Sequence, residues 1–250
     1  MSNKICFIIA HKYYRGYESY LKYYVENVQA FYPEALIIIV DNNSKYPEDV
    51  FGPLRGLSGV VLLTNDIESK FELGAYSVGI KYIIDNNLVN KYSHYVCTQD
   101  NFVLKNKYDF NQLLDKKTYA LPLNSMHPDG YAMDVCNVVL DRIGLNDNWD
   151  KVNFCWCSSF IVANHKLEQL YGYLATIVQK VRRDSEAAER YLARILWELN
   201  ERRDCGSIDG NCIDLLTKHY HCWHVNILDD ATTCFVKRVQ QKNEHTIDKE

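Results

Sequence analysis

Short apolar runs dominate the first hundred residues, and they constrain the fold more than any other feature of the sequence. Apolar strands without polar alternation are typical of parallel sheets that are covered on both faces. The segments between the runs carry apolar residues at helical spacing, as in Leu21, Tyr24 and Val28. Strands that alternate with helices predict an α/β fold, in which helices cover both faces of a mixed, mostly parallel sheet. The predicted strands are 4–11, 35–44, 59–66 and 92–101, and the predicted helices are 17–33 and 72–89.

The second half of the chain has a less regular pattern. Apolar residues at helical spacing, among them Tyr191, Ile195 and Leu199, make 185–203 the strongest helix prediction of the chain. The polar residues after 236 predict a frayed tail at 237–250. The other predicted elements are a helix at 166–182 and strands at 118–123, 131–141, 152–165 and 219–228.

Length and composition bound the class of protein. A chain of 250 residues suits one α/β domain, and its net charge of −4 does not favour binding to nucleic acid. The nine cysteines are odd in number and lie partly in apolar runs, which favours reduced thiols and a cytoplasmic protein. No apolar window approaches the ~18 residues of a membrane span, and the first apolar run is too short for a signal peptide. We therefore expect neither a membrane span nor a signal peptide.

Each strand predicted in the first half ends in or is followed by a polar residue. In open α/β sheets, ligands bind beyond the carboxyl ends of the strands. We therefore expect these polar residues to converge on one edge of the sheet and to form a binding site there. They are His11, Asp41, Asn65 and Asp100.

Four sequence segments resemble one enzyme family by their order and spacing: "FIIAHK", "IIIVDNNS", "ELGAYSVGIKYI" and "YVCTQDN". Two weaker segments follow, "CWCSSFIVANH" and "EAAERYLARI". Together they resemble the GT-A-type glycosyltransferases, near the inverting family 2, over roughly residues 3–230.

The resemblance implies a single GT-A-like domain at 1–236, with a nucleotide-binding half at about 1–105 and an acceptor-binding half at about 106–236. It implies transfer of a hexose or pentose from a nucleoside-diphosphate sugar, such as a UDP-sugar, with inversion. The acceptor would be a hydroxyl group of a glycan, a lipid-linked molecule or a protein. The oligomeric state stays open.

The resemblance assigns the nucleotide to the ends of the first strands. Ala10 and His11, then Asp41, would embrace the base and ribose, with Asn43 and Asn65 beside them. A carboxylate at Asp41 can accept the imide N–H of uracil or thymine, or the N1–H and amino group of guanine. Taken alone, the segment that starts at Asp41 is better explained as an Asx-type turn that closes a strand, and the neighbouring segments favour the nucleotide site.

Two glycines, Gly74 and Gly79, stand inside the predicted helix 72–89, where each costs about 1 kcal/mol relative to alanine. One explanation is close packing of the helix on the sheet. The other is that the helix N-terminus and its free N–H groups approach the nucleotide. Glu72 could contact the ribose or cap the helix.

The end of the fourth strand departs from the family pattern. Family members carry Asp-x-Asp here, and the two carboxylates and the diphosphate bind Mn²⁺ or Mg²⁺. In this chain the residues are Gln99, Asp100 and Asn101, so a single residue is anionic. The resemblance implies that Asp100 is a metal ligand, that Gln99 or Asn101 adds a neutral oxygen or binds sugar hydroxyls, and that the late His221 completes the metal shell or contacts the diphosphate. One charge fewer weakens the metal, so a site that relies on basic residues also stays open.

The late cysteines and histidines offer a different metal site. They could together bind Zn²⁺, although their spacing matches no paired Cys-x2-Cys motif. The residues in question are Cys155, Cys157, Cys205, Cys212, Cys222, His219, His221 and His224.

An inverting transfer needs a base for the acceptor hydroxyl, usually Asp or Glu near the start of a helix. The segment "DSEAAERYLARI" resembles this family position, with Glu189, Glu186 and Asp184 as candidates. Glu189 is favoured because it lies one turn before Leu192 of the apolar stripe, and Arg190 or Arg194 could hold it or the diphosphate. The alternative is a solvated helix face with Glu–Arg pairs.

The segment "CWCSSF" would form the acceptor wall, with Trp156 as a platform for a sugar ring and Ser158 as a polar contact. A second class of function remains: a catalytically inactive module that binds a nucleotide-sugar or a glycan. Its support is the single carboxylate at 99–101.

Overall fold

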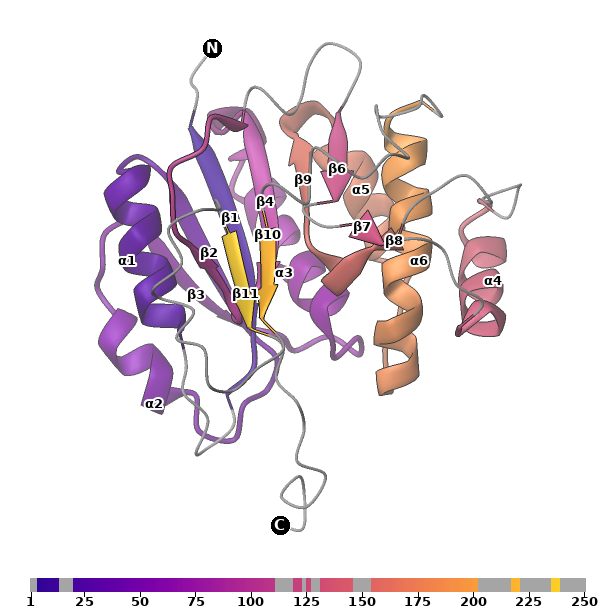
Figure 1. The fold of residues 1–250 in the computed structure, drawn as a ribbon, viewed down its shortest axis with the longest axis horizontal. Helices are drawn as coiled ribbons and strands as arrows, with labels where there is room; N and C mark the ends of the chain where they lie inside the picture. The colour runs from indigo at the N-terminus through magenta and orange to yellow at the C-terminus, as the bar shows by residue number, and fades with distance from the viewer. Residues whose placement is uncertain are drawn as a thin grey trace.

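A sheet of six strands forms the centre of the molecule, in the order β3-β2-β1-β4-β9-β6 (Figure 1). The computed structural model describes residues 4–13, 20–110, 119–122, 125–126, 131–145, 154–201, 217–220 and 235–238. The first four strands in this order are parallel, and β9 is antiparallel to both of its neighbours. The α/β fold with a mixed, mostly parallel sheet is therefore confirmed. The strands are β1 Ile5–His11, β2 Leu36–Asp41, β3 Val60–Thr64, β4 His94–Gln99, β6 Ala120–Pro122 and β9 Phe160–Ala163.

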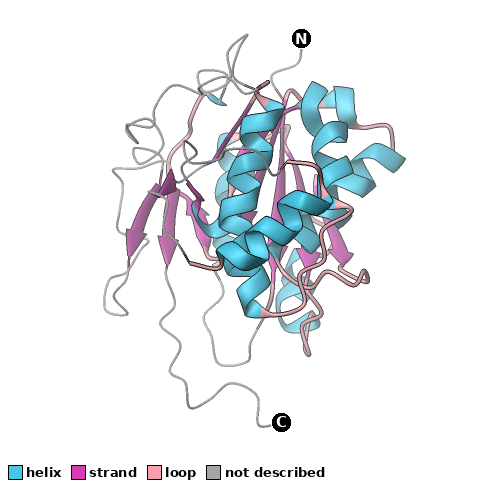
Figure 2. Ribbon diagram, turned by 90° about the vertical axis from the view of Figure 1, so that its right-hand side faces the viewer, coloured by secondary structure: helices cyan, strands magenta, loops and turns pink. Residues whose placement is uncertain are grey.

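Helices cover both faces of this sheet, as predicted. The side chains of β1 alternate, so that Ile8 packs in the cluster with α3, α5 and α6, and Phe7 packs in the cluster with α1 and α2. Figure 2 shows the helices lying across the strands. The helices are α1 Leu21–Phe31, α2 Glu48–Phe51, α3 Glu72–Asp85, α4 Met133–Arg142, α5 Leu167–Leu174 and α6 Arg182–Leu199, with short 3-10 turns at Gly52–Leu54, Val89–Lys91, Trp156–Ser158 and Asn164–Lys166.

The two glycines of α3 serve close packing. A Cβ at Gly79 would lie 2.6 Å from Cγ2 of Ile8 on β1, so this glycine lets the helix sit directly on the sheet. A Cβ at Gly74 would lie 2.1 Å from the carbonyl oxygen of Ser69. The packing explanation therefore accounts for both residues without a ligand.

A second sheet joins the end of the chain to its middle. It has the order β10-β11-β5, with β11 antiparallel to β5 and parallel to β10. Phe102 of β5 and Phe235 of β11 pack in the same cluster as α1. β11 continues through Arg238, so the predicted tail boundary at 237 falls inside a strand. The strands are β5 Phe102–Leu104, β10 Thr217–Tyr220 and β11 Phe235–Arg238, and β7 Ser125–Met126 pairs separately with β8 Phe154–Cys155.

The strand predicted at 131–141 is wrong, because this segment contains the helix α4. Its valines suggest a strand, but Cys136 and Leu140 are buried four residues apart and face α6. Asp134 in the first turn and Arg142 in the last turn also suit the helix dipole. Tertiary packing on α6 therefore overrides the β propensity of the valines.

The strand predicted at 152–165 is interrupted. It divides into β8 and β9 around a turn in which Cys157 and Ser158 have φ values of 59° and 48°. The helix predicted at 166–182 ends at Leu174, and α6 begins at Arg182. None of the described helices is long and apolar enough to cross a membrane.

Candidate functional site

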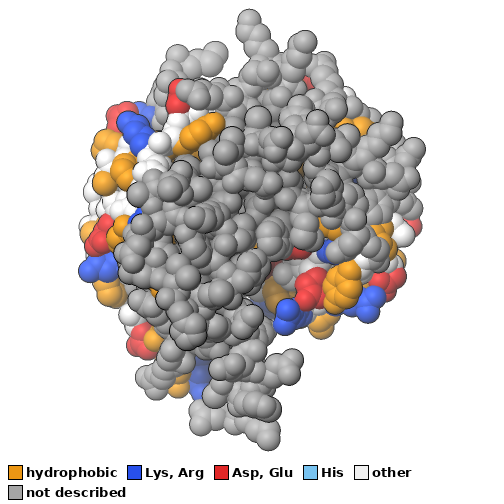
Figure 3. All heavy atoms as spheres, viewed as in Figure 1, with side chains coloured by type: hydrophobic (Ala, Val, Ile, Leu, Met, Phe, Trp, Pro, Cys, Tyr) orange, Lys and Arg blue, Asp and Glu red, His pale blue; other side chains and the backbone are white. Residues whose placement is uncertain are grey.

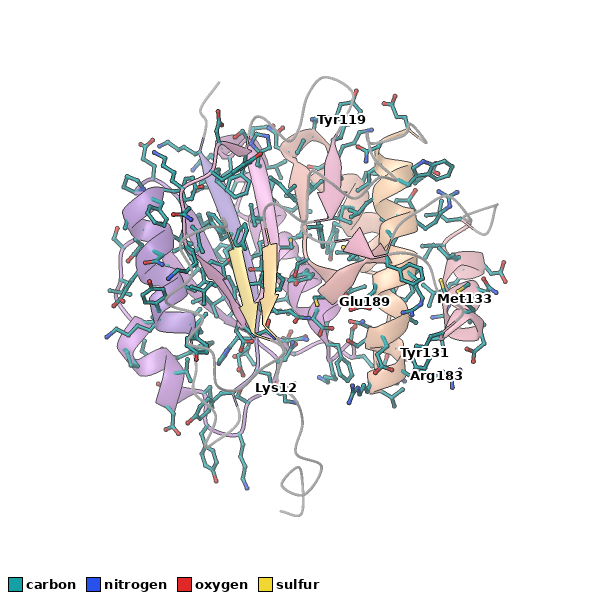
Figure 4. The ribbon with its side chains drawn as sticks, in the orientation of Figure 1. Lys12, Tyr119, Tyr131, Met133, Arg183 and Glu189 are labelled. Carbon is teal, nitrogen blue, oxygen red and sulfur yellow. The ribbon has the colours of Figure 1, made fainter. Side chains whose placement is uncertain are left out.

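The polar strand ends of the first half meet at one edge of the sheet, as the sequence predicts. The register pairs His11 with Asp41, and Ala10 with Gln99. The Asn65 N–H donates to the Asp41 carbonyl at 2.7 Å, and the Asp100 N–H donates to the Ala10 carbonyl at 3.0 Å. Figure 4 shows Lys12, the residue after β1, at this lower end of the strands. We call this the carboxyl edge; it comprises His11, Asp41, Asn65, Gln99 and Asp100.

His11 and Asp100 form a close side-chain contact at the carboxyl edge. The His11 Nδ1 lies 2.6 Å from Oδ2 of Asp100, and the Lys12 N–H donates to the same oxygen at 3.1 Å. His11 is 1% exposed, and the Asp100 side chain is 26% exposed. The other ring nitrogen of His11, Nε2, is buried and has no hydrogen-bond partner among the described residues. The ring of Phe51 lies 5.8 Å from the imidazole ring.

Asp41 closes a turn, which is the local alternative that the sequence left open. Its Oδ2 accepts the Ser44 N–H at 2.8 Å, and its Oδ1 accepts the Ser44 hydroxyl. The Ser44 Oγ in turn accepts the Tyr13 N–H at 2.8 Å. Asp41 is 1% exposed, so both carboxylate oxygens are already used inside the protein. Asn43, in contrast, is exposed and stands at a φ of 56°.

Asn65 organises the loop between β3 and α3. Its Nδ2 donates to Asn42 Oδ1 and to the Ser69 carbonyl, both at 2.7 Å, and its Oδ1 accepts the Ile67 N–H at 3.2 Å. Asn65 is fully buried. The loop backbone at Ser69 is the group that excludes a side chain at Gly74. The donor-site candidates Asn65 and Gly74 therefore shape the carboxyl edge from within.

Glu72 links the carboxyl edge to α6. Its Oε1 accepts the Gln99 amide N–H at 2.8 Å, and its Oε2 accepts the Ser185 hydroxyl at 2.8 Å. The capping role proposed for Glu72 falls instead to Gln179, whose Oε1 accepts the Leu73 N–H at 3.0 Å. Sequence reasoning missed Ser185 and Gln179, because more than a hundred residues separate them from their partners.

The three acidic candidates on α6 occupy different settings. Asp184 caps the helix, since its Oδ2 accepts the N–H groups of Lys180 and Val181 at 2.7 and 3.0 Å. Glu186 accepts hydrogen bonds from Arg182 Nε at 2.8 Å and from the Tyr131 hydroxyl at 2.9 Å. The bond to Glu186 raises the pKa of Tyr131 above its ordinary value.

The surface around these acidic side chains carries mixed charges. Arg183 pairs with Asp134 at 2.7 Å, next to the Arg182–Glu186 pair. Figure 3 shows acidic and basic side chains interspersed on this part of the molecule. The solvated-face alternative thus describes the first turn of α6 well.

Glu189 holds the turn between β8 and β9. Its Oε1 accepts the Cys157 N–H at 2.8 Å, and Arg190 Nη1 lies 4.0 Å from its Oε2. Figure 4 shows Glu189 on the side of α6 toward the strands, whereas Tyr131 and Arg183 lie toward α4. Cys157 and Ser158 have positive φ values, and such a backbone conformation costs about 1–3 kcal/mol for each residue other than glycine. It persists where the surroundings hold it, often at functional sites, and the hydrogen bond from Cys157 to Glu189 holds it here.

The two acceptor-wall candidates lie in this turn. Ser158 is 2% exposed, so its side chain does not face solvent. The side chain of Trp156 lies outside the described residues, and its predicted role as a sugar platform stays a prediction.

Arg190 and Arg194 are buried in the protein, at 3% and 0% exposure. The Arg190 guanidinium stacks on the ring of Phe154 at 4.4 Å, and its Nη1 donates to the Glu186 carbonyl at 2.6 Å. Arg194 stacks on Trp197 at 4.3 Å and donates to Glu198 at 3.2 Å. Arg190 is therefore placed to hold Glu189, and neither arginine presents an open face to a diphosphate.

The described cysteines do not form a zinc site. Burial, followed by the charge of Glu189, raises the pKa of the Cys155 thiol well above its ordinary value. Neutral buried thiols are poor metal ligands. Among the described residues, no group of three or more His, Cys, Asp or Glu could hold a metal ion. His221, His224, Cys205, Cys212 and Cys222, and the side chain of His219, lie outside the described part of the chain.

The sequence matches no protein-family model and no curated protein.

Proposed function

We propose that this chain is a GT-A-type glycosyltransferase that moves a hexose or pentose from a nucleoside-diphosphate sugar to an acceptor hydroxyl, with inversion. The observation that carries the proposal is the link between the carboxyl edge and α6. Glu72 binds Gln99 at the end of β4 and Ser185 in the first turn of α6, each at 2.8 Å. Polar strand ends and a helix with acidic residues therefore lie side by side, as a transfer between donor and acceptor requires.

The donor belongs beyond the carboxyl ends of the parallel strands. Asp41 and Asn65 shape this edge through their internal hydrogen bonds, and Asn43 is exposed beside them. Asp100 and Asn101 lie in the turn that follows β4. We infer that the nucleoside lies near the ends of β1 and β2, and that the diphosphate and sugar lie near 99–101.

The described residues do not by themselves form a site for Mn²⁺ or Mg²⁺. Asp100 is the one anionic residue of the segment 99–101, and its Oδ2 already accepts hydrogen bonds from His11 and Lys12. Its Oδ1 is the oxygen that a cation could share with the diphosphate. A bound divalent cation would offset negative charge on the leaving nucleoside diphosphate.

The chemical step is a single displacement. A carboxylate accepts the proton of the acceptor hydroxyl while that oxygen forms a bond to the anomeric carbon, and the bond from this carbon to the diphosphate oxygen breaks. Glu189 is the leading candidate for this base. Its side chain is 19% exposed, it lies beside the Cys157 turn, and Arg190 supports it. Glu186 is second, and Asp184 is last because it caps α6.

The second candidate function is an inactive module that binds a nucleotide-sugar or glycan. The observation that favours it is the internal use of the polar groups: Asp41 is closed by Ser44, and Glu189 is tied to Cys157. Binding and turnover separate the two functions.

The experiment has two stages. First, a panel of nucleoside-diphosphate sugars is screened for a rise in melting temperature, because a ligand of the native state stabilises it. Second, the sugars that bind are tested for slow hydrolysis without acceptor. Binding with hydrolysis supports a transferase, binding without hydrolysis or transfer supports the module, and a panel without any binder contradicts both.

A further inference from the structure

The outermost strand of the central sheet, β3, has backbone groups on one side that the described part of the chain does not bind. β2 is the one neighbour of β3 among the described strands. The Asn65 N–H donates to the Asp41 carbonyl at the end of β2. Because alternate residues of a strand direct their backbone groups to the same side, Val61 and Leu63 face β2 as well. The residues that direct their N–H and C=O groups outward are Val60, Leu62 and Thr64.

The sequence of β3 does not protect this outer side. Outermost strands of native sheets are usually shielded by lysine, proline, a bulge or a covering segment, because their free backbone groups are a template for another strand. β3 reads Val-Val-Leu-Leu-Thr, with no charged residue and no proline. Val60 and Leu62 pack toward α1, and Val61 and Leu63 pack toward α3, so both faces of the strand are held. β3 is therefore a preformed template.

The strand at the other side of the sheet, β6, is shielded in the expected way (Figure 1). The Asn200 side chain binds its backbone: Oδ1 accepts the Ala120 N–H at 3.0 Å, and Nδ2 donates to the Ala120 carbonyl at 2.7 Å. Pro122 in the same strand has no N–H to offer. The chain thus closes one side of its sheet with its own groups, and β3 on the other side lacks both devices.

We propose that the outer side of β3 pairs with β3 of a second copy of this chain, antiparallel, about a two-fold axis at Leu62. The two Leu62 residues then exchange both of their backbone hydrogen bonds. Thr64 lies opposite Val60 of the other copy and donates its N–H to that carbonyl. The Val60 N–H already donates to the Leu57 carbonyl at 3.2 Å, so it adds no bond between the copies. The proposal does not depend on the proposed function.

The turns that flank β3 favour a second copy over an unrelated partner. Leu57 before the strand and Ile67 after it are 36% and 37% exposed, and they stand at equal distances in sequence from Leu62. Antiparallel pairing about Leu62 brings the turn of Leu57 toward the turn of Ile67 in the other copy. It also brings the exposed Arg55 toward the end that carries the exposed Asp66. The surface is therefore complementary to itself in shape, apolarity and charge.

The size of this surface predicts a weak dimer. One strand and two turns bury less than the roughly 1,600 Å² of a standard interface, so we expect a dissociation constant on the order of 10 µM. The paired strands run in opposite directions, and the two carboxyl edges therefore face opposite ways. The dimer leaves the candidate site of each copy open.

The test combines sedimentation with hydrogen exchange of the unmodified chain. We expect a monomer at about 1 µM and mostly dimer at about 300 µM. Over that range the exchange of the Leu62 and Thr64 N–H groups should slow by about 5-fold or more, because pairing protects them. Val61 and Leu63 are internal controls, since their N–H groups bind β2 at every concentration.

Variants assign the dimer to β3. Thr64 is exposed, so Thr64→Lys keeps the fold, which a melting curve checks, and it should weaken the dimer about 10-fold or more. Thr64→Pro removes the outward N–H, keeps the ladder to β2 and should act in the same direction. The matched control is Thr176→Lys, at an exposed threonine beyond the end of α5, and it should dimerise like the parent. A chain that stays monomeric at about 300 µM overturns the proposal. A dimer in which Leu62 and Thr64 exchange as fast as in the monomer, or which Thr64→Lys does not weaken, overturns it as well.

Discussion

The strands of the central sheet bury a histidine at each end, and the two histidines differ in how their polar atoms are used. His11 lies at the carboxyl edge, and His94 lies at the opposite ends of the parallel strands, which we call the amino edge. At the amino edge, His94 Nδ1 lies 2.8 Å from the Ser93 hydroxyl. The Ser93 N–H donates to the Lys4 carbonyl at 2.8 Å, and the Ser93 carbonyl accepts the Asn164 N–H at 3.1 Å. At the carboxyl edge, His11 Nε2 and Asn101 Oδ1 are buried without partners among the described residues. Among the described residues, buried polar atoms without a partner therefore occur at the carboxyl edge, whereas Ser93 and His94 contain none.

This difference has a physical origin in the direction of the strands. Parallel strands bring all their carboxyl ends to one side, and the sequence places His11, Asp41 and Asp100 there. Side chains that serve the fold alone need enough partners to satisfy each other. The carboxyl edge has buried polar atoms without a partner among the described residues. We therefore predict that substitutions of its polar side chains change ligand binding and turnover, whereas substitutions at the amino edge change stability.

The largest effect is expected at the helix that faces the carboxyl edge. Glu189→Gln should lower the turnover number about 10²-fold or more and leave donor affinity nearly unchanged. The glutamine carbonyl can still accept the Cys157 N–H, so the turn is kept and the loss reports the missing charge. Steady-state kinetics of transfer measures both parameters.

The control for this change is Glu198→Gln, near the other end of α6, where the carboxylate pairs with Arg194. It should leave turnover unchanged. Full activity in Glu189→Gln would move the base to Glu186 or Asp184 and leave Glu189 as the residue that holds the turn.

A stability effect of about 1–3 kcal/mol is expected from Gly74→Ala. The new Cβ would lie 2.1 Å from the Ser69 carbonyl oxygen and 2.9 Å from Asn65 Nδ2, so the loop that shapes the carboxyl edge must move. Gly172→Ala in α5 is the matched control. Outside its own stretch of helix, no described residue has an atom within 4 Å of the Cβ that this substitution adds, and alanine favours the helix by about 0.5–1 kcal/mol. Chemical denaturation compares the two, and equal stability of both variants would contradict the packing explanation.

The sequence predicts the carboxyl edge better than the contacts that complete it. Apolar runs identify β1 to β4, and the ends of parallel strands must meet, so the convergence of His11 and Asp41 follows from pattern alone. The partners do not follow. Ser185 and Gln179 reach Glu72 and Leu73 from the far half of the chain, and no local pattern marks such contacts.

The sequence predicts the secondary structure of the second half less well, because its helices and strands depend on packing between distant segments. The valines of 131–141 favour a strand, yet burial of Cys136 and Leu140 against α6 makes the segment a helix. The turn at Cys157 is equally hidden, because neither Cys157 nor Ser158 is a residue type that favours a positive φ, and Glu189 holds the turn from another part of the chain. Local propensity is enough to predict the buried strands of the first half. In the second half, tertiary contacts determine whether a segment forms a strand or a helix.

An intermediate effect is expected from metal at the carboxyl edge. Mn²⁺ should tighten binding of the nucleoside diphosphate by about 10-fold, or 1.4 kcal/mol, in the parent protein. Asp100→Asn should lose that gain, because Asp100 is the one carboxylate of the segment 99–101. Calorimetric titration with and without Mn²⁺ measures it.

A chelator should leave the fold intact, because the metal would bind weakly without nucleotide. Full transfer activity in excess chelator would instead defeat the metal role. Asp100 would then serve His11 and the hydroxyl groups of the donor sugar.

The smallest effect is expected at the amino edge. Burial lowers the pKa of His94 below its ordinary value of 6.5, and the charge of Asp109 opposes this shift in part. In the unfolded chain the histidine takes up its proton as the pH falls through about 6.5, whereas the folded protein takes it up only at lower pH. The unfolded state therefore binds more protons in this window, and the stability of the native protein falls as the pH is lowered. His94→Asn should remove this contribution, so the difference in melting temperature between parent and variant should shrink by on the order of a degree from pH 7.5 to pH 5.5. Nucleotide affinity should not change in the variant. A difference that stays constant with pH, or a loss of nucleotide binding in His94→Asn, would erase the distinction between the two edges of the sheet.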